Sequence, residues 1–206
     1  MAGGWNSLKG FSVFPSITTY FPRMAESSLE HCARWWDIAS SQDLTTSPTV
    51  LLDAETLKVV PHWVELDYSS HKVDNVDSKH ALMIWPATSL DYNRRYIVAV
   101  RGLKEGNGDA IAPSKAFQHL RDNTTPRTTR EKHFSNLFSS LESVGVARSD
   151  LQIAWDFTTN DKEDVTGRLV HARDDAKKRI GEDGPVLLQD MSMTFFLTLF
   201  PSIFVV

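Results

Sequence analysis

The chain has 206 residues, of which 41% are hydrophobic, and a formal net charge of −4. This length suits one domain with appended segments, and the composition excludes a wholly disordered or fibrous chain. Lys and Arg number 22 against 26 Asp and Glu, and because no basic block occurs, we predict no nucleic-acid partner. The single cysteine, Cys32, excludes an intrachain disulfide and a cysteine-rich zinc site.

Residues 1–46 are predicted to form an irregular extension rich in aromatic residues. Met1 is not followed by the basic segment and apolar run of a secretory signal, so either the protein is not secreted or its start lies upstream. Gly, Ser and Pro recur between the aromatic residues, which we expect to lie against the face of a sheet. The alternative is a stacking surface for a ligand such as a sugar, with Trp35 and Trp36 as the candidate binding residues.

Short β-type runs separated by turn residues begin near residue 47. The runs are 49–52, 57–66, 81–85, 96–101 and 151–157. Several strands at this spacing predict an antiparallel sandwich rather than a parallel sheet with crossover helices. Aromatic residues bury large areas, so we expect Trp63, Trp85 and Trp155 to hold the two sheets together.

Two helices are predicted within and after these runs. Thr128 and Glu131 have the spacing of a capping box, and apolar residues then recur at intervals of three and four up to about residue 144. A second helix is expected at about 164–180, because its first turn is acidic and its last turn is basic, as the helix dipole favours. Gly145 and Gly181 stand where each helix should end.

The motifs that accompany catalysis are missing from the sequence. It contains no G-x-S-x-G, no glycine-rich phosphate loop and no pair of histidines at metal-binding spacing. The neighbours His31 and Cys32 lack a third positioned group, and the acidic residues between Asp156 and Asp164 do not follow the order of a calcium loop. We therefore predict no catalytic residue, no metal ligand and no cofactor.

The last residues, 191–206, are almost entirely apolar. This run is shorter than the roughly 20 residues of a spanning helix, and Pro201 would interrupt helical hydrogen bonding. Three interpretations remain: a buried strand or tail of a truncated domain, an artefactual end, or a tail anchor that contacts a membrane.

The segment from Leu90 to Phe117 reads LDYNRRYIVAVRGLKEGNGDAIAPSKAF. It resembles a recurring segment of bacterial Ig-like (SbsA-like) sandwich domains. The predicted helix followed by residues 151–159 is similar to the end of such a domain in the N-terminal region of bacterial virulence-factor lipases. There the sandwich precedes an α/β-hydrolase domain. The similarity covers roughly residues 47–160 and departs from the pattern at Glu105, where Asp is more usual.

This resemblance implies a mainly β fold: an Ig-like antiparallel β-sandwich at 47–160 with two accessory helices. Residues 161–190 would then form a helix and the start of a truncated domain. The implied function is a non-catalytic accessory module of a secreted or surface lipase-like protein, partnered by a neighbouring catalytic domain and located outside the cell or at its surface. Two alternatives are a free-standing ligand- or carbohydrate-binding module and a hydrolase with an unrecognised site.

Overall fold

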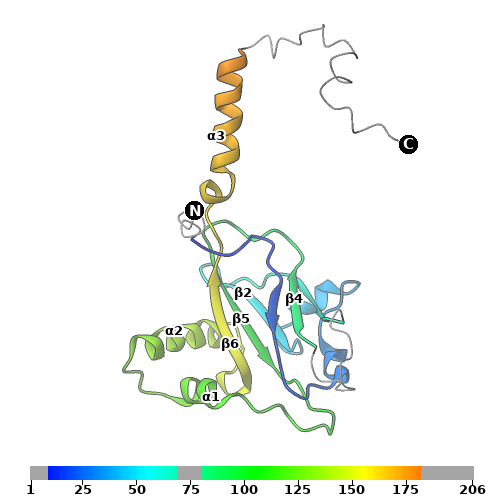
Figure 1. Ribbon diagram of the computed structural model, residues 1–206. Coiled ribbons are helices and arrows are strands. Elements are labelled where there is room, and N and C mark those ends of the chain that lie inside the picture. Colours follow the sequence, from blue (N-terminus) through cyan, green and yellow to red (C-terminus); the bar gives the residue numbers. More distant parts are fainter. Residues whose placement is uncertain (1–8, 69–79, 182–206) are drawn as a thin grey trace, which may run out of the picture. The chain divides into compact units, whose positions relative to one another are not determined.

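The computed structural model describes residues 9–68 and 80–181 (Figure 1). The chain divides into two compact units, 1–165 and 166–206. The strands are β1 (Ile17–Thr19), β2 (Thr49–Asp53), β3 (His62–Leu66), β4 (Leu82–Pro86), β5 (Arg95–Arg101) and β6 (Leu151–Thr158). The α-helices are α1 (Lys115–Asp122), α2 (Thr129–Ser143) and α3 (Lys162–Ile180). Short 3-10 helices span Glu26–His31, Ile38–Gln42 and Arg148–Asp150.

The strands form two three-stranded antiparallel sheets, in the orders β1-β4-β3 and β2-β5-β6. In the first sheet Val64 pairs with Ile84, and in the second Val98 pairs with both Leu51 and Trp155. The antiparallel arrangement predicted for the runs after residue 47 is thus confirmed. Strand β1 lies within the segment that was expected to be irregular.

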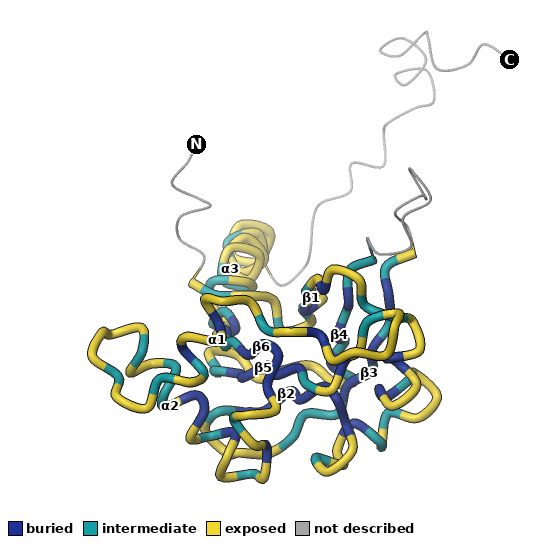
Figure 2. Tube along the Cα trace, turned by 90° about the horizontal axis from the view of Figure 1, so that it is seen from below, coloured by how far each residue is buried: buried dark blue, intermediate teal, exposed yellow. Residues whose placement is uncertain are grey.

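Two hydrophobic clusters pack against opposite faces of the β2-β5-β6 sheet. One contains residues of both sheets, among them Leu51, Val98 and Ile84. The other contains Val50 and Ile97 from the sheet, with residues of α1 and α2. Figure 1 shows α1 and α2 on one side of β5 and β6, with β4 on the other, and Figure 2 shows buried residues concentrated along the strands. The centre of the fold is therefore the β2-β5-β6 sheet.

The expected role of the tryptophans is wrong for Trp63 and Trp85. In β3 and β4 the fully buried positions alternate with half-buried ones, and both tryptophans occupy half-buried positions. Their rings stack on each other, with centroids 6.2 Å apart, while Val64 and Ile84 enter the shared core. Successive side chains of a strand point to opposite faces, so these tryptophans lie on the outer face. Trp155 does pack against the core.

Helix α1 was absent from the sequence prediction, and with it the described chain holds more residues in α-helices than in strands. The fold is therefore mixed α and β rather than mainly β. The side chain of Ser114 caps α1 by accepting a hydrogen bond from the Phe117 N–H, which satisfies a donor that the helix leaves open. Phe117 and Leu120 are the buried residues of this helix.

Helix α2 confirms the predicted capping box. Thr128 Oγ1 accepts from the Glu131 N–H at 3.2 Å, and Glu131 Oε2 accepts from the Thr128 N–H at 2.9 Å. The Glu131 carboxylate also accepts from the Arg127 N–H at 2.7 Å. Because the bonds from the Thr128 and Arg127 N–H groups favour the charged form, they lower the pKa of Glu131 to about 2. The apolar stripe also forms as predicted, since Leu137, Phe138 and Leu141 are fully buried.

His62 links the two sheets through a buried hydrogen-bond network. It is wholly inaccessible to solvent, and its Nδ1 lies 2.9 Å from the carbonyl oxygen of Val60, which can only accept. Nδ1 therefore carries the proton, and Nε2 accepts from the Thr49 hydroxyl at 2.9 Å. The His62 N–H donates to Ser41 Oγ at 3.1 Å. The ring is thus held as a neutral imidazole with every polar atom bonded.

We expect this buried ring to make the fold sensitive to mild acid. Burial lowers the pKa of His62 below its usual 6.5, and interactions with the backbone of Val60 and of Thr49 oppose that shift only in part. Below pH 6.5 the His62 ring is therefore protonated in the unfolded chain, while in the folded chain it stays neutral. The free energy of unfolding should fall as pH drops from 7 to 5.5, by up to about 1.4 kcal/mol per pH unit. Urea denaturation at several pH values measures this slope.

A His62→Gln variant provides the comparison for this pH effect. It should be less stable at pH 7 and should lose much of the slope between pH 7 and 5.5. Asp53 and Asp156 have pKa values below the usual 3.8, so they affect stability only in stronger acid. An equal slope in the variant and the native chain would assign the acid sensitivity to other groups.

Helix α3 spans the predicted 164–180 and starts two residues earlier, at Lys162. None of its residues is buried. Among residues 9–68 and 80–181, no helix is long and apolar enough to cross a membrane. The apolar run 191–206, for which a strand, an artefact and a tail anchor were considered, lies outside the described residues, as does the predicted start of a further domain after residue 181.

Candidate functional site

The two tryptophans predicted as binding residues form the tip of a turn. The Asp37 N–H donates to the Arg34 carbonyl oxygen at 2.8 Å, so Trp35 and Trp36 are the central residues of a four-residue turn. Each is 67% exposed. Their rings meet edge to face, with centroids 5.2 Å apart and an interplanar angle of 89°. The turn therefore holds two large aromatic rings in solvent.

The base of this turn is fixed to the first sheet. Ala33 is only 1% exposed, and its carbonyl oxygen accepts from the Val64 N–H of β3 at 2.8 Å. The preceding Cys32 belongs to the core shared by the two sheets. Aromatic side chains with few rotatable bonds on a fixed base lose little entropy on binding. The structure therefore gives the predicted pair the exposure and the anchoring that a stacking site needs.

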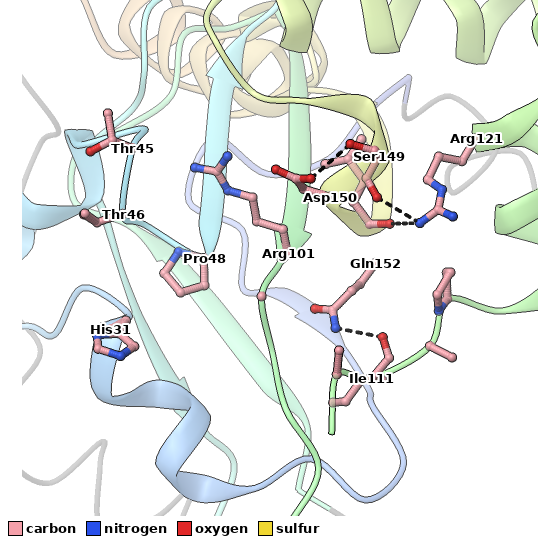
Figure 3. A pocket seen from close by; sticks show the side chains of 15 residues that line it. His31, Thr45, Thr46, Pro48, Arg101, Ile111, Arg121, Ser149, Asp150 and Gln152 are labelled. Atoms are coloured by element: carbon pink, nitrogen blue, oxygen red, sulfur yellow. Dashed lines mark hydrogen bonds between the residues drawn. The ribbon is translucent and has the colours of Figure 1, made fainter. Parts of the chain in front are cut away.

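A groove of about 580 Å³ is lined by segments distant in the sequence. Arg101 comes from the end of β5, Arg121 from α1, and Gln152 from the start of β6. His31 and Asp150 also line it (Figure 3). Sequence reasoning did not single out this groove, because no local motif connects these residues.

The arginines of the groove donate to main-chain carbonyl oxygens. Arg101 Nε donates to Ser47 at 3.2 Å, and its Nη2 donates to Leu44. Arg121 Nη1 donates to Leu151 at 3.0 Å and to the carbonyl oxygen of Ser149 at 3.3 Å, as drawn in Figure 3. These bonds join β5 and α1 to neighbouring segments, so both side chains have a structural task.

Gln152 ties the floor of the groove together. Its side chain is almost fully buried. Oε1 accepts from the Leu103 N–H at 2.8 Å, while Nε2 donates to the carbonyl oxygens of Leu103 and Ile111, each at 2.8 Å. Both side-chain amide atoms are thus engaged in fixing the segment that follows β5, and neither is left to bind a ligand.

One hydroxyl–histidine pair of the described chain, Thr49 with His62, is fully buried and out of reach of a substrate. Burial raises the pKa of Cys32 to about 12 against the opposing charge of Arg34, so this thiol is unreactive at neutral pH. In the groove, the Ser149 hydroxyl donates to Asp150 at 3.0 Å rather than to a histidine. A serine nucleophile needs an adjacent general base, and these contacts do not supply one.

A histidine–carboxylate pair joins α2 to β6. His133 Nε2 lies 2.7 Å from Asp156 Oδ1, and Arg95 Nε donates to Asp156 Oδ2 at 2.7 Å. Partial burial raises the pKa of Asp156, but the hydrogen bonds from His133 and Arg95 outweigh it and place that pKa below the usual value. The carboxylate is thus held charged, as expected of an ion-pair network that fastens a helix to a sheet.

Within residues 9–68 and 80–181, no group of three or more His, Cys, Asp or Glu could hold a metal ion. The acidic residue Asp161 instead accepts from the Asp164 N–H at 2.9 Å, at the start of α3. Asp161 is therefore a cap of α3, whereas Asp156 pairs with Arg95.

No protein-family model matches the chain. The curated proteins likewise contain no match to it.

Proposed function

We propose that this chain is a non-catalytic accessory module of a secreted or cell-surface lipase-like protein, built on an Ig-like β-sandwich at residues 47–160. The resemblance of Leu90–Phe117 to such domains suggested this function. The two antiparallel sheets that share one core are compatible with a sandwich. The partner in this proposal is a neighbouring catalytic domain of a longer parent chain.

One observation carries the non-catalytic part of the proposal. Three of the polar side chains that line the groove, Arg101, Arg121 and Gln152, donate to the protein's own backbone. Catalytic groups must be within reach of substrate and matched in proton affinity to their task. Side chains that hydrogen-bond to the protein's own loops stabilise those loops, as expected of a scaffold that positions another domain.

Ester hydrolysis tests this function directly. The purified chain should show no turnover above the blank with p-nitrophenyl acetate or p-nitrophenyl palmitate. The full-length transcript of the source should continue beyond Asp190 into a G-x-S-x-G segment, and its product should hydrolyse one of these esters. Turnover by the present chain, or a longer transcript without a serine elbow, would refute the proposal.

The exposed tryptophan pair favours a second function, a ligand- or carbohydrate-binding module. Two rings at 67% exposure on an anchored turn leave apolar area in water that a flat ligand would cover. Adding cellohexaose or chitohexaose should then shift the tryptophan fluorescence of the chain in a saturable manner. Replacing both Trp35 and Trp36 with Ala should abolish the shift.

The control for this titration is Phe14→Ala. Phe14 is also strongly exposed, at 61%, but lies outside the turn. This variant should keep the response of the native chain. An unchanged response in the tryptophan variant, or no response in the native chain, would remove the carbohydrate interpretation.

A further inference from the structure

The outer face of the β1-β4-β3 sheet carries two tryptophans, a methionine and one carboxylate. Trp63 and Glu65 of β3 and Met83 and Trp85 of β4 are half-buried. Along each strand they alternate with residues that enter the core shared by the two sheets. Both strands belong to the compact unit 1–165, so this face lies within a single unit.

The strand register brings these four side chains together. Trp63 pairs with Trp85, and Glu65 pairs with Met83. Residues directly opposite each other have Cβ atoms about 4.5–5.5 Å apart, and diagonal neighbours are about 7–8 Å apart. The two ring planes differ by only 14°, with centroids 6.2 Å apart. The four residues therefore form one patch, the tryptophan–glutamate patch, in which the acid stands beside two nearly parallel rings.

The Glu65 carboxylate has no partner in the described part of the chain. Neither a hydrogen bond nor an ion pair joins it to another residue of 9–68 and 80–181. On β1 the outward residue that pairs with Met83 is the neutral Thr18, so the outward positions of the three strands include no base. The faces of aromatic rings attract cations, as does a carboxylate. Both parts of the patch therefore favour a positively charged occupant.

We infer that the tryptophan–glutamate patch docks an arginine side chain of another protein. A guanidinium is planar, so it can stack on an indole ring while its N–H groups donate to the adjacent carboxylate of Glu65. A lysine ammonium is a more strongly hydrated point charge without a flat face. The inference does not rest on the proposed function, because the ester assay and the binding test below measure separate properties.

A second copy of this chain does not suit the patch. A two-fold pair would bring the same patch of both copies together, and neither copy has a base there to meet Glu65. The two carboxylates would instead face each other, which is unfavourable.

A lipid headgroup with a quaternary ammonium is also a poorer occupant than arginine. It satisfies the rings through its charge. It has no N–H group, however, so it cannot donate a hydrogen bond to Glu65.

Three peptides test the inference with the full chain. Each has four threonines around a central arginine, lysine or citrulline; citrulline has the shape of arginine without its charge. In 50 mM salt, the indole N–H signals of Trp63 and Trp85 in nuclear magnetic resonance spectra should shift in a saturable manner. The Kd of the arginine peptide should be at least about fivefold lower than that of the citrulline peptide, and at least about threefold lower than that of the lysine peptide. The indole signals are assigned by their loss in Trp63→Phe and Trp85→Phe.

A pair of glutamate variants tests the role of the carboxylate. Glu65→Gln keeps the size of the side chain but removes its charge, and should raise the Kd of the arginine peptide at least about fivefold. The Kd of the citrulline peptide should change less than about twofold. Glu142→Gln makes the same change at an exposed residue of α2 and should leave both values within about twofold. Equal effects of the two variants would mean that Glu65 does not bind the guanidinium.

Four further outcomes would overturn the inference. Equal or undetectable binding of the three peptides would remove the role of the charge. Shifts confined to the signals of Trp35 or Trp36 would assign the binding to their turn. Tighter binding to phosphatidylcholine vesicles than to the arginine peptide would assign the patch to a lipid headgroup. Dimerisation in sedimentation that Glu65→Gln abolishes would assign the patch to self-association.

Discussion

Replacing Gln152 with Leu should lower the free energy of unfolding by about 3 kcal/mol. The substitution removes the partners of the Leu103 N–H and the Ile111 carbonyl oxygen, in residues that are 0% and 6% exposed. The Leu103 carbonyl oxygen keeps one bond, from the Ile111 N–H at 3.1 Å. A buried group left unpaired costs about 1–3 kcal/mol, and two such groups remain. Urea denaturation monitored by circular dichroism measures the loss.

Gln118→Leu is the control for this prediction. Gln118 lies on the exposed side of α1, so the same chemical change there should alter the free energy of unfolding by less than about 0.5 kcal/mol. If Gln152→Leu is no more destabilising than Gln118→Leu, the side chain does not hold the floor of the groove. The groove would then have a polar amide to offer to a ligand, which would weaken the case for a purely structural site.

Features encoded locally were the ones that sequence reasoning found. The capping box of α2 depends on Thr128 and Glu131, which are three residues apart. Strand β6 was predicted from the short run 151–157 and is found at Leu151–Thr158. Such signals depend on neighbours in the chain, and tertiary contacts here reinforce them instead of overriding them.

Features held by distant contacts were missed or misread. Helix α1 has only two buried residues, and its last carbonyl groups are bonded by Arg148, which lies beyond α2. Strand β1 is three residues long and is defined by pairing with β4. In β3 and β4 apolar residues occur on both faces, so alternation alone could not tell whether Trp63 or Val64 enters the core.

The two candidate sites also depend on contacts between residues that are distant in the sequence. Composition pointed to Trp35 and Trp36, but the turn that presents them is anchored by the bond between Ala33 and Val64, which pairs residues far apart in the chain. The groove unites Arg101, Arg121 and Gln152 from three elements. No spacing in the sequence connects those residues, so only the folded arrangement shows that they line one surface and are structurally engaged.

The Phe138→Ala substitution should be at least as destabilising as Gln152→Leu, with a loss of about 4 kcal/mol. Phe138 is fully buried, and its ring lies 6.0 Å from that of Phe117 and 5.9 Å from that of Phe134, measured between centroids. Truncating a buried phenylalanine typically costs about 3–5 kcal/mol, because apolar contacts are lost and a cavity remains. Phe14→Ala removes an exposed ring and should change the free energy of unfolding by less than about 0.5 kcal/mol.

Part of the effect at Phe138 should depend on Arg148. The Arg148 guanidinium lies 4.4 Å from the centroid of the Phe138 ring, and it also donates to the carbonyl oxygens of Leu120 and Asn123 at the end of α1. A double-mutant cycle with Phe138→Leu and Arg148→Met, both milder than alanine, should give a coupling energy of about 1 kcal/mol. Purely additive effects would show that the ring does not position the arginine, and α1 would then be held to α2 by apolar packing alone.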